Sequence, residues 1–305
     1  MEITKDMFVP ISKNIEEAEL IVRPSISFWQ DVWRRLRKNP VAIASLILLA
    51  FLVIMVIFGP YFNEFEFNRI NSSLKDISPN STYWFGTDSA GRDIFTRVWV
   101  AGRVSLEIGF LAALLSTSIG ILYGSISGFI GGRTDTIMMR IIEILSALPY
   151  LLVVILFQIR LQDRSLKTLL LALTITGWTG TARIVRGEVL RVKAQEFILA
   201  ARTLGVSAWK IIVKHLIPNV MPIVIVSITF NVPGFIFAEA FLSYLGIGLA
   251  PPATSWGIMC AEAQTTMMFY PYQLIFPTLM ISLVMLVFAL LGDGLRDALD
   301  PKLRK

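Results

Sequence analysis

The sequence predicts an all-α polytopic membrane protein with six transmembrane helices, and three observations support this prediction. Of the 305 residues, 55% are hydrophobic and only 16% are charged, a balance that does not suit the surface of a water-soluble domain. The apolar residues gather in six segments that are long enough to be considered as spans. Most of the 28 Lys and Arg residues fall in segments that six crossings would place on the same side of the membrane.

Residues 1–40 are predicted to form a cytoplasmic segment that ends in a helix lying on the inner face of the membrane. Ser27 and Gln30 have the spacing of a capping box, which marks the start of a helix. The predicted helix has an apolar stripe and a basic flank, formed by Phe28, Val32 and Leu36 and by Arg34, Arg35, Arg37 and Lys38. The alternative is an ordinary positive flank before the first span, where basic residues are expected in any case.

The first transmembrane helix is predicted at 41–60, and the other five helices form a core at 104–292. No small-residue cleavage site follows the first span, so it is expected to remain as an anchor. Residues 61–103 are expected to form an extracytoplasmic loop and 293–305 a cytoplasmic tail. The fourth span is the shortest and must extend towards residue 184 to cross the hydrocarbon. The six apolar segments are 41–58, 106–130, 136–157, 169–181, 220–245 and 272–291.

The distribution of basic residues predicts that both termini are cytoplasmic. Lys and Arg are frequent before the first span, between the fourth and fifth spans and at the carboxyl end, and they are sparse in the predicted outer loops. The formal net charge of +6 would also suit a nucleic-acid partner. No nucleic acid is expected, however, because the basic residues lie between apolar spans and do not follow one amphipathic face.

Several chemistries are disfavoured by what the chain lacks. Its one cysteine, Cys260, cannot form an internal disulfide, and its one histidine, His215, cannot build a structural zinc site. No G-x-x-x-x-G-K-[ST] loop is present to cradle the phosphates of ATP. We therefore expect no enzyme activity, no metal and no cofactor bound by this chain, and we expect any ATPase to be a separate subunit.

The basic segment at about 184–219 is predicted to form two helices joined by a turn. Residues 196–204 contain neither Pro nor Gly and favour a helix, and Gly205 permits a turn. Ser207 can cap a second helix, which Pro218 is expected to end.

This segment is also predicted to dock a cytoplasmic partner. Ala200, Ala201 and Gly205 leave a low surface at the corner, where side chains of a partner can approach closely. The neighbouring basic residues that can meet acidic groups are Arg202, Lys210 and Lys214. The alternative is an ordinary basic loop that only fixes the topology.

The pattern in this segment resembles the EAA loop of ATP-binding-cassette (ABC) importers, through which a membrane subunit holds its ATPase. The residues of the predicted coupling loop are Glu196, Ala200, Ala201, Arg202, Gly205, Leu216 and Pro218. Further blocks resemble the second permease subunit of dipeptide and oligopeptide importers, at 33–40, 85–93, 239–257 and 291–301. One departure is Leu199, which stands where the EAA pattern often has its glutamate.

The resemblance implies the type I ABC importer permease fold and a place in the bacterial inner (plasma) membrane. It implies a homologous second permease subunit, two cytoplasmic ATPase subunits that hold ATP and magnesium, and an extracytoplasmic substrate-binding protein, all within membrane lipid. ATP would close the ATPase pair, and the coupling loops would pass that motion to the translocation pathway. Oligopeptides are the expected substrate, and dipeptides, glutathione or nickel are the alternatives.

Two outer blocks are candidates for the surface that receives the binding protein. Their residues are Gly86, Thr87, Asp88, Gly91, Arg92 and Asp93, with Ser255, Trp256 and Gly257. The alternative is a loop that is folded by its own Gly, Asp and Arg interactions.

Four residues within the spans are further candidates, because ionisable groups and helix breaks in a membrane carry a cost. Glu143 is expected to pair with Arg140. Glu239 is expected to accept backbone N–H groups near the glycine-rich turn after the fifth span. Pro149 and the Asn231–Pro233 stretch are expected to interrupt the third and fifth spans, where exposed carbonyl groups can line a pathway.

The second span carries a stripe of small residues with a period of four. These residues are Ala112, Ser116, Gly120, Gly124, Gly128 and Gly132. They form a flat helix face that allows close approach of another helix. Packing within this subunit is the favoured interpretation, and a sliding surface between two permease subunits is the alternative.

Two other classes of protein remain as alternatives. A self-sufficient secondary transporter needs its own ion or proton site near the middle of the membrane, and this chain offers few acidic groups there. A membrane receptor or scaffold would explain the small-residue stripe and the basic segment, but not the ordered blocks at both membrane faces.

Overall fold

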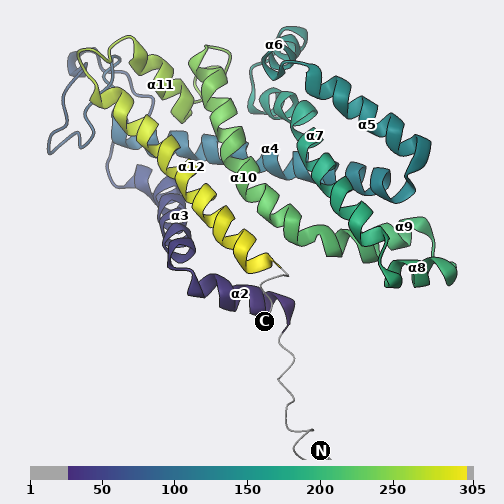
Figure 1. Ribbon diagram of the computed structural model, residues 1–305. Helices are drawn as coiled ribbons and strands as arrows, with labels where there is room; N and C mark the ends of the chain where they lie inside the picture. The colour runs from purple at the N-terminus through teal and green to yellow at the C-terminus, as the bar shows by residue number, and fades with distance from the viewer. Residues whose placement is uncertain (1–26, 301–305) are drawn as a thin grey trace, which may run out of the picture.

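The computed structural model describes residues 27–300, which form helices and connecting loops (Figure 1). The one β feature of this range is an isolated bridge between Thr87 and Asp93. The predicted all-α class is therefore confirmed for the described residues. Residues 1–26 of the predicted cytoplasmic segment and residues 301–305 of the predicted tail lie outside them.

The long helices follow one another with mostly short connections, apart from the loop before α4. The elements are α2 (Phe28–Lys38), α3 (Pro40–Phe58), η2 (Gly59–Tyr61), η3 (Ser72–Leu74), α4 (Ile94–Ile130), α5 (Gly132–Ala147), α6 (Tyr150–Leu161), α7 (Leu166–Lys193), α8 (Glu196–Thr203), α9 (Ala208–Ile211), the π-helical segment η4 (Ile212–Leu216), α10 (Ile217–Tyr244), α11 (Trp256–Gln264) and α12 (Tyr272–Leu299).

Five stretches of helix in the described range are long and apolar enough to cross a membrane, and a sixth is present if α5 and α6 form one span. These two helices meet at an angle of 82°. The break lies at Leu148, which is extended because it precedes Pro149. Pro149 thus lies at a break between the two helices that cover the predicted third span.

The fourth and fifth spans are longer than predicted. The segment that looked shortest in the sequence belongs to α7, a helix of 28 residues. The fifth span is helical from Ala208 to Tyr244, so the predictions that Pro218 ends a helix and that Asn231–Pro233 interrupts one are wrong. Pro218 comes just after the π-helical segment η4, where the α-helical hydrogen-bond pattern is already interrupted, and Pro233 is buried inside a helix that packing holds together.

The predicted outer loop at 61–103, by contrast, is shorter than predicted, because α4 begins at Ile94. Asp93 caps the helix by accepting the backbone N–H of Thr96 at 2.8 Å. Charged residues in the first turns of α4 made this stretch look like a loop in the sequence. The short helix α11 (Trp256–Gln264) was not predicted from the sequence.

The small-residue stripe of α4 packs against α7 of the same chain, which confirms the favoured interpretation. A Cβ atom on Gly124 would lie 2.4 Å from the carbonyl oxygen of Ala182, and one on Gly120 would lie 2.7 Å from the Cβ of Thr181. Gly132 does not belong to the stripe, because α4 has already ended at Ile130. The two backbones are therefore in direct contact over several turns.

The elements separate towards two ends of the molecule (Figure 1). The helix α2, the last turn of α12 and the α8–α9 segment lie at the lower end of the view, and α6 and α11 lie at the upper end. This grouping puts both ends of the described chain on the same side as the predicted coupling segment.

Candidate functional site

The turn at the predicted coupling segment is built by local hydrogen bonds. Gly205 has a φ of +75°, and its N–H donates to the carbonyl of Arg202 at 3.0 Å. The N–H of Val206 donates to the carbonyl of Ala201 at 3.1 Å. These two bonds form a Schellman motif, in which glycine takes the left-handed position after the helix. The predicted turn at Gly205 is therefore present.

Within this segment, Ala201 faces the protein and not a partner. Its side chain is 8% exposed, and it belongs to a buried cluster with Ile198, Val189 and Val192. The prediction that Ala201 forms part of a low docking surface is therefore wrong. The α8 helix has two faces, and sequence spacing alone did not show which of them packs against α7.

Arg202 also contacts its own chain. Its guanidinium carbon lies 4.5 Å from the ring centre of Phe129 in the last turn of α4, and the ammonium group of Lys193 lies 5.8 Å from the same ring. Beside them, Arg186 donates two hydrogen bonds to Asp135, at 2.6 and 2.5 Å. The Arg202 contact connects α8 to α4, and the Lys193 and Arg186 contacts connect α7 to α4 and α5.

The exposed surface of this segment includes large apolar side chains among its charged and polar residues. We define the docking ridge as Leu199, Leu204 and Trp209, which project from the two helices that meet at the Gly205 turn. Leu204 is 82% exposed and Trp209 is 59% exposed. Large apolar side chains exposed at a polar membrane face are typical of a protein interface. These three residues were not predicted from the sequence, which indicated the small and basic residues as the docking surface.

A β-branched residue at Gly205 is expected to weaken the coupling segment. Nothing lies within 4 Å of a Cβ atom at this position, so the effect comes only from the positive φ. The change Gly205→Val is expected to cost roughly 1–2 kcal/mol in the turn, because valine adopts the left-handed conformation poorly. Thermal unfolding of the detergent-purified protein measures the effect.

Gly205→Asn is the matched control, because asparagine tolerates the left-handed conformation much better than valine does. Equal losses in the two variants would contradict the role of the φ angle.

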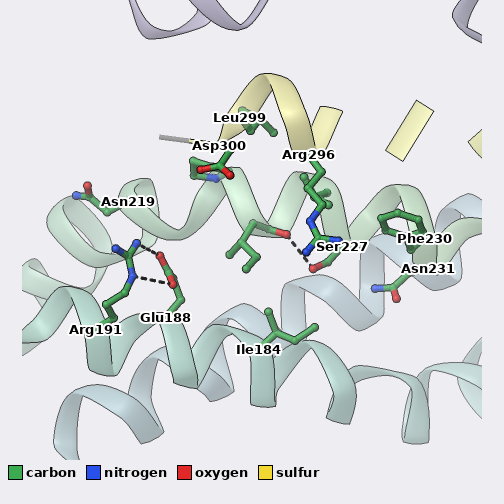
Figure 2. A pocket seen from close by; sticks show the side chains of 13 residues that line it. Ile184, Glu188, Arg191, Asn219, Ser227, Phe230, Asn231, Arg296, Leu299 and Asp300 are labelled. Atoms are coloured by element: carbon green, nitrogen blue, oxygen red, sulfur yellow. Dashed lines mark hydrogen bonds and ion pairs between the residues drawn. The ribbon is translucent and has the colours of Figure 1, made fainter. Parts of the chain in front are cut away.

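A cavity of ≈ 520 Å³ opens between α7, α10 and the end of α12. Figure 2 shows Ile184, Glu188 and Arg191 of α7 on one side, residues of α10 on the other, and Arg296, Leu299 and Asp300 above. Glu188 and Arg191 form an ion pair on one wall. The lining mixes apolar side chains with paired charges and amides, a combination that is typical of small-molecule and peptide sites in general.

Asn231 lines this cavity as well. Its side-chain amide donates to the hydroxyl of Thr181 at 3.2 Å, which connects α10 to α7. Glu143 lies elsewhere, on α5, where it pairs with Arg140 at 2.7 Å as predicted.

The predicted outer residues form a folded block. Asp88 is buried and accepts hydrogen bonds from Arg92 and Arg97. Glu262 of α11 accepts from the same two arginines, at 2.8 Å each. The sequence analysis missed Arg97 and Glu262. Arg97 could have been noticed because it lies in an apolar stretch of the sequence. No feature of the sequence indicated a role for Glu262.

The other members of this block pack inwards too. The hydroxyl of Thr87 donates to the carbonyl of Leu74 at 2.5 Å. A Cβ atom on Gly91 would lie 1.9 Å from the carbonyl oxygen of Asn71, and a Cβ atom on Gly86 would lie 2.5 Å from that of Ile77. The buried members are Gly86, Thr87, Asp88, Gly91, Asp93, Ser255, Trp256 and Gly257. These residues therefore support the surface of the block and are not themselves exposed on it.

Glu239 is fully buried, and the prediction about its partners is wrong in detail. Its carboxyl group accepts from the hydroxyls of Ser243 at 2.7 Å, Ser255 at 2.6 Å and Ser105 at 3.3 Å. No backbone N–H of the described residues donates to it. The three serines come from α10, α4 and the start of α11, so this carboxyl group joins three elements.

Removal of the Ser255 hydroxyl is expected to destabilise this junction. The same oxygen accepts the N–H of Ile258 at 3.2 Å and so caps α11. The change Ser255→Ala is expected to lower stability by about 1–3 kcal/mol, because it removes both the cap and a hydrogen bond to a buried carboxyl group. Thermal unfolding of the detergent-purified protein measures the change.

Ser243→Ala removes a hydrogen bond to Glu239 without removing a cap, so its effect is expected to be smaller. A larger effect of Ser243→Ala than of Ser255→Ala would contradict this assignment.

Comparison with known proteins gives two family matches. The family described as "Binding-protein-dependent transport system inner membrane component" matches residues 120–305. The family described as "N-terminal TM domain of oligopeptide transport permease C" matches residues 27–80.

Two relatives from Bacillus subtilis (strain 168) match along the whole chain. The oligopeptide transport system permease protein OppC is 48% identical over 303 residues, which cover 99% of each chain. The dipeptide transport system permease protein DppC is 48% identical over 305 residues, which cover 100% of this chain and 95% of the relative.

A solved structure shares the fold. In the inward-facing MetNI methionine ABC transporter, a chain aligns with a TM-score of 0.53 at 18% identity, covering 65% of this chain and 94% of that one. At this level of identity the similarity concerns the fold alone.

Proposed function

Because this chain belongs to the family of binding-protein-dependent transport system inner membrane components, we propose that it forms half of the translocation pathway of an ATP-driven importer of peptides, most of all oligopeptides. The observation that carries this proposal is the match along the whole chain to permease proteins of an oligopeptide system and a dipeptide system. The match includes the coupling segment, the cavity and the outer block.

The proposed complex contains a second, homologous permease, two cytoplasmic ATPase subunits and an extracytoplasmic binding protein. ATP and magnesium belong to the ATPase subunits in this arrangement. Among the described residues, no group of three or more His, Cys, Asp or Glu side chains is placed to hold a metal ion. The docking ridge contacts an ATPase subunit, and both termini lie in the cytoplasm with it.

Motion of the docked ATPase reaches the membrane through two rigid connections. The first is α9, which continues through η4 into α10. The second is the contact of Arg202 with Phe129, which connects α8 to α4. Since α7 and α10 both line the cavity, rotation at the docking ridge changes the shape of the proposed pathway.

Dipeptides are the second candidate substrate, since a dipeptide permease matches this chain at the same identity as an oligopeptide permease. Glutathione and nickel remain further alternatives. A self-sufficient secondary transporter is disfavoured by the surroundings of Glu239. That carboxyl group is fully buried among three serine hydroxyls and does not line the cavity between α7, α10 and α12.

Uptake of labelled peptides of graded length tests the proposal. The complete complex is placed in vesicles with the binding protein outside and ATP inside. ATP-dependent uptake is expected, with the length profile giving the substrate class. ATP-independent uptake by this chain alone would overturn the proposal in favour of a secondary transporter.

A further inference from the structure

Within the described range 27–300, the helix α2 packs against the rest of the chain through one face. Val32 and Leu36 are buried, and they pack in a cluster with Ala42 of α3 and with Ala298 and Leu299 of α12. The capping box predicted from the sequence is present, because the N–H of Ser27 donates to the Gln30 side chain at 3.1 Å and the N–H of Gln30 donates back to Ser27 at 3.4 Å. The apolar stripe therefore packs inside the protein, whereas the tryptophans and basic residues of α2 are largely exposed within the described range.

The chain fixes the level of α2 at the boundary of the hydrocarbon. α2 ends at Lys38 and the first span begins at Pro40, so Asn39 alone separates them. The side chain of Asn39 caps the span by accepting the N–H groups of Val41 and Ala42 at 3.1 Å each. In Figure 1, α2 runs across the lower ends of α3 and α12 and does not continue their direction. A helix in this position lies in the headgroup region of a bilayer.

Two tryptophans point away from the protein on this helix. Trp29 is 56% exposed and Trp33 is 42% exposed. The guanidinium carbon of Arg37 lies 4.8 Å from the ring centre of Trp33, which places a positive charge against the aromatic face. Tryptophan is enriched at membrane interfaces, because its ring is apolar and its N–H is polar.

The remaining flank of α2 is basic and borders a groove. A cavity of ≈ 370 Å³ between α2 and the end of α12 is lined by Arg34, Arg35 and Lys38 together with Asn39 and Asp297. Asp31 forms ion pairs with Arg34 at 2.9 Å and with Arg35 at 3.0 Å. α2 itself carries four basic residues and one acidic residue, so its outer face keeps a positive charge.

We propose that the outer face of α2 binds the headgroups of anionic phospholipids in the adjacent membrane leaflet. We define this lipid face as Trp29, Trp33, Arg34, Arg37 and Lys38. The phosphate groups meet the basic side chains, and the two indole rings lie at the boundary with the acyl chains. The proposal goes beyond the transport function and does not depend on which substrate is carried.

Lipid binding at α2 also affects the cavity between α7, α10 and α12, because one residue belongs to both. Leu299 of α12 packs on the inner side of α2 and lines the cavity between α7, α10 and α12. A lipid that holds α2 against the membrane therefore also holds one wall of that cavity.

Native mass spectrometry of the complete detergent-purified complex tests the proposal, with phosphatidylglycerol and phosphatidylcholine added as the two probes. The test variant is Arg34→Gln, Arg37→Gln and Lys38→Gln combined. Each basic residue near an anionic surface strengthens the attraction about fivefold. The number of phosphatidylglycerol molecules retained by the variant is expected to fall at least about fivefold, with no change for phosphatidylcholine.

The matched control removes three positive charges far from α2, by Arg69→Gln, Lys75→Gln and Arg160→Gln. These three residues are exposed on the outer loop and on α6. The control is expected to retain phosphatidylglycerol as the unchanged protein does. An equal loss in the control and the test variant would overturn the proposal, because it would show a dependence on net charge only.

A second variant, Trp29→Ala with Trp33→Ala, checks the aromatic part. It is expected to lower retention of phosphatidylglycerol while the thermal stability of the complex is kept.

Unchanged retention in the Gln variant, with loss of the ATPase subunits instead, would also overturn the proposal and would assign this face to a protein partner. Displacement of the lipid by inorganic phosphate at constant ionic strength would show a site for free phosphate, which the proposal does not allow.

Discussion

The combined change Leu204→Asp and Trp209→Ala is expected to abolish ATP-driven uptake while the subunit remains in the membrane. Both side chains are exposed at the Gly205 turn and make few contacts within their own chain, so the fold does not need them. In an interface, truncation of one well-packed anchor costs about 2 kcal/mol or more, which is about thirtyfold in affinity. The introduced carboxylate would in addition lie where the partner buries apolar surface.

Copurification of the ATPase subunits with the membrane domain, followed by transport-coupled ATP hydrolysis, measures this effect. Ile70→Asp is the matched control, since Ile70 is also highly exposed but lies in the loop at the other end of the molecule. The control is expected to retain the ATPase subunits fully. Normal copurification and normal coupled hydrolysis in the ridge variant would refute the docking role of Leu204 and Trp209.

The change Gly124→Val is expected to destabilise the membrane domain and to lower its abundance. The first added carbon would meet the carbonyl oxygen of Ala182 at 2.4 Å, and a backbone atom cannot move aside as a flexible side chain can. Overpacking of this kind costs about 1–3 kcal/mol, and here it separates the two helices that form the largest contact of the fold. Abundance in the membrane and the unfolding temperature of the purified protein measure the result.

Gly187→Ala is the control for this prediction, because nothing lies within 4 Å of a Cβ atom at that helical position. The alanine is expected to leave stability unchanged or to raise it by up to about 1 kcal/mol through helix propensity. An equal drop in both variants would mean that close contact between α4 and α7 is not the cause.

The sequence was sufficient wherever the signal is local. The capping box at Ser27, the turn at Gly205 and the flat face of α4 depend on residues within one or two helical turns, and each is present. Five of the six apolar segments also lie in single long helices, and the third covers the bent pair α5 and α6.

What the sequence did not show depends on contacts between distant residues. Arg97 and Glu262 are 165 positions apart, and no spacing rule connects them. Ala201 and Ala200 looked equivalent until the packing of α8 on α7 buried only the first of them. The three serine partners of Glu239 likewise come from separate elements, so a carboxyl group flagged in the sequence gave no clue to its donors.

The π-helical segment η4 lies between the docking ridge and α10, and it sets the rotational register of Trp209 relative to the fifth span. A π turn holds its hydrogen bonds between residues five apart, where an α turn uses four, so η4 contains about one residue more than an α turn would. Each residue of an α-helix turns the chain by about 100°. An all-α-helical chain would therefore place Trp209 roughly a quarter of a circle away around the axis of α10. Residues 212–216 thus determine the direction in which the exposed indole of Trp209 faces.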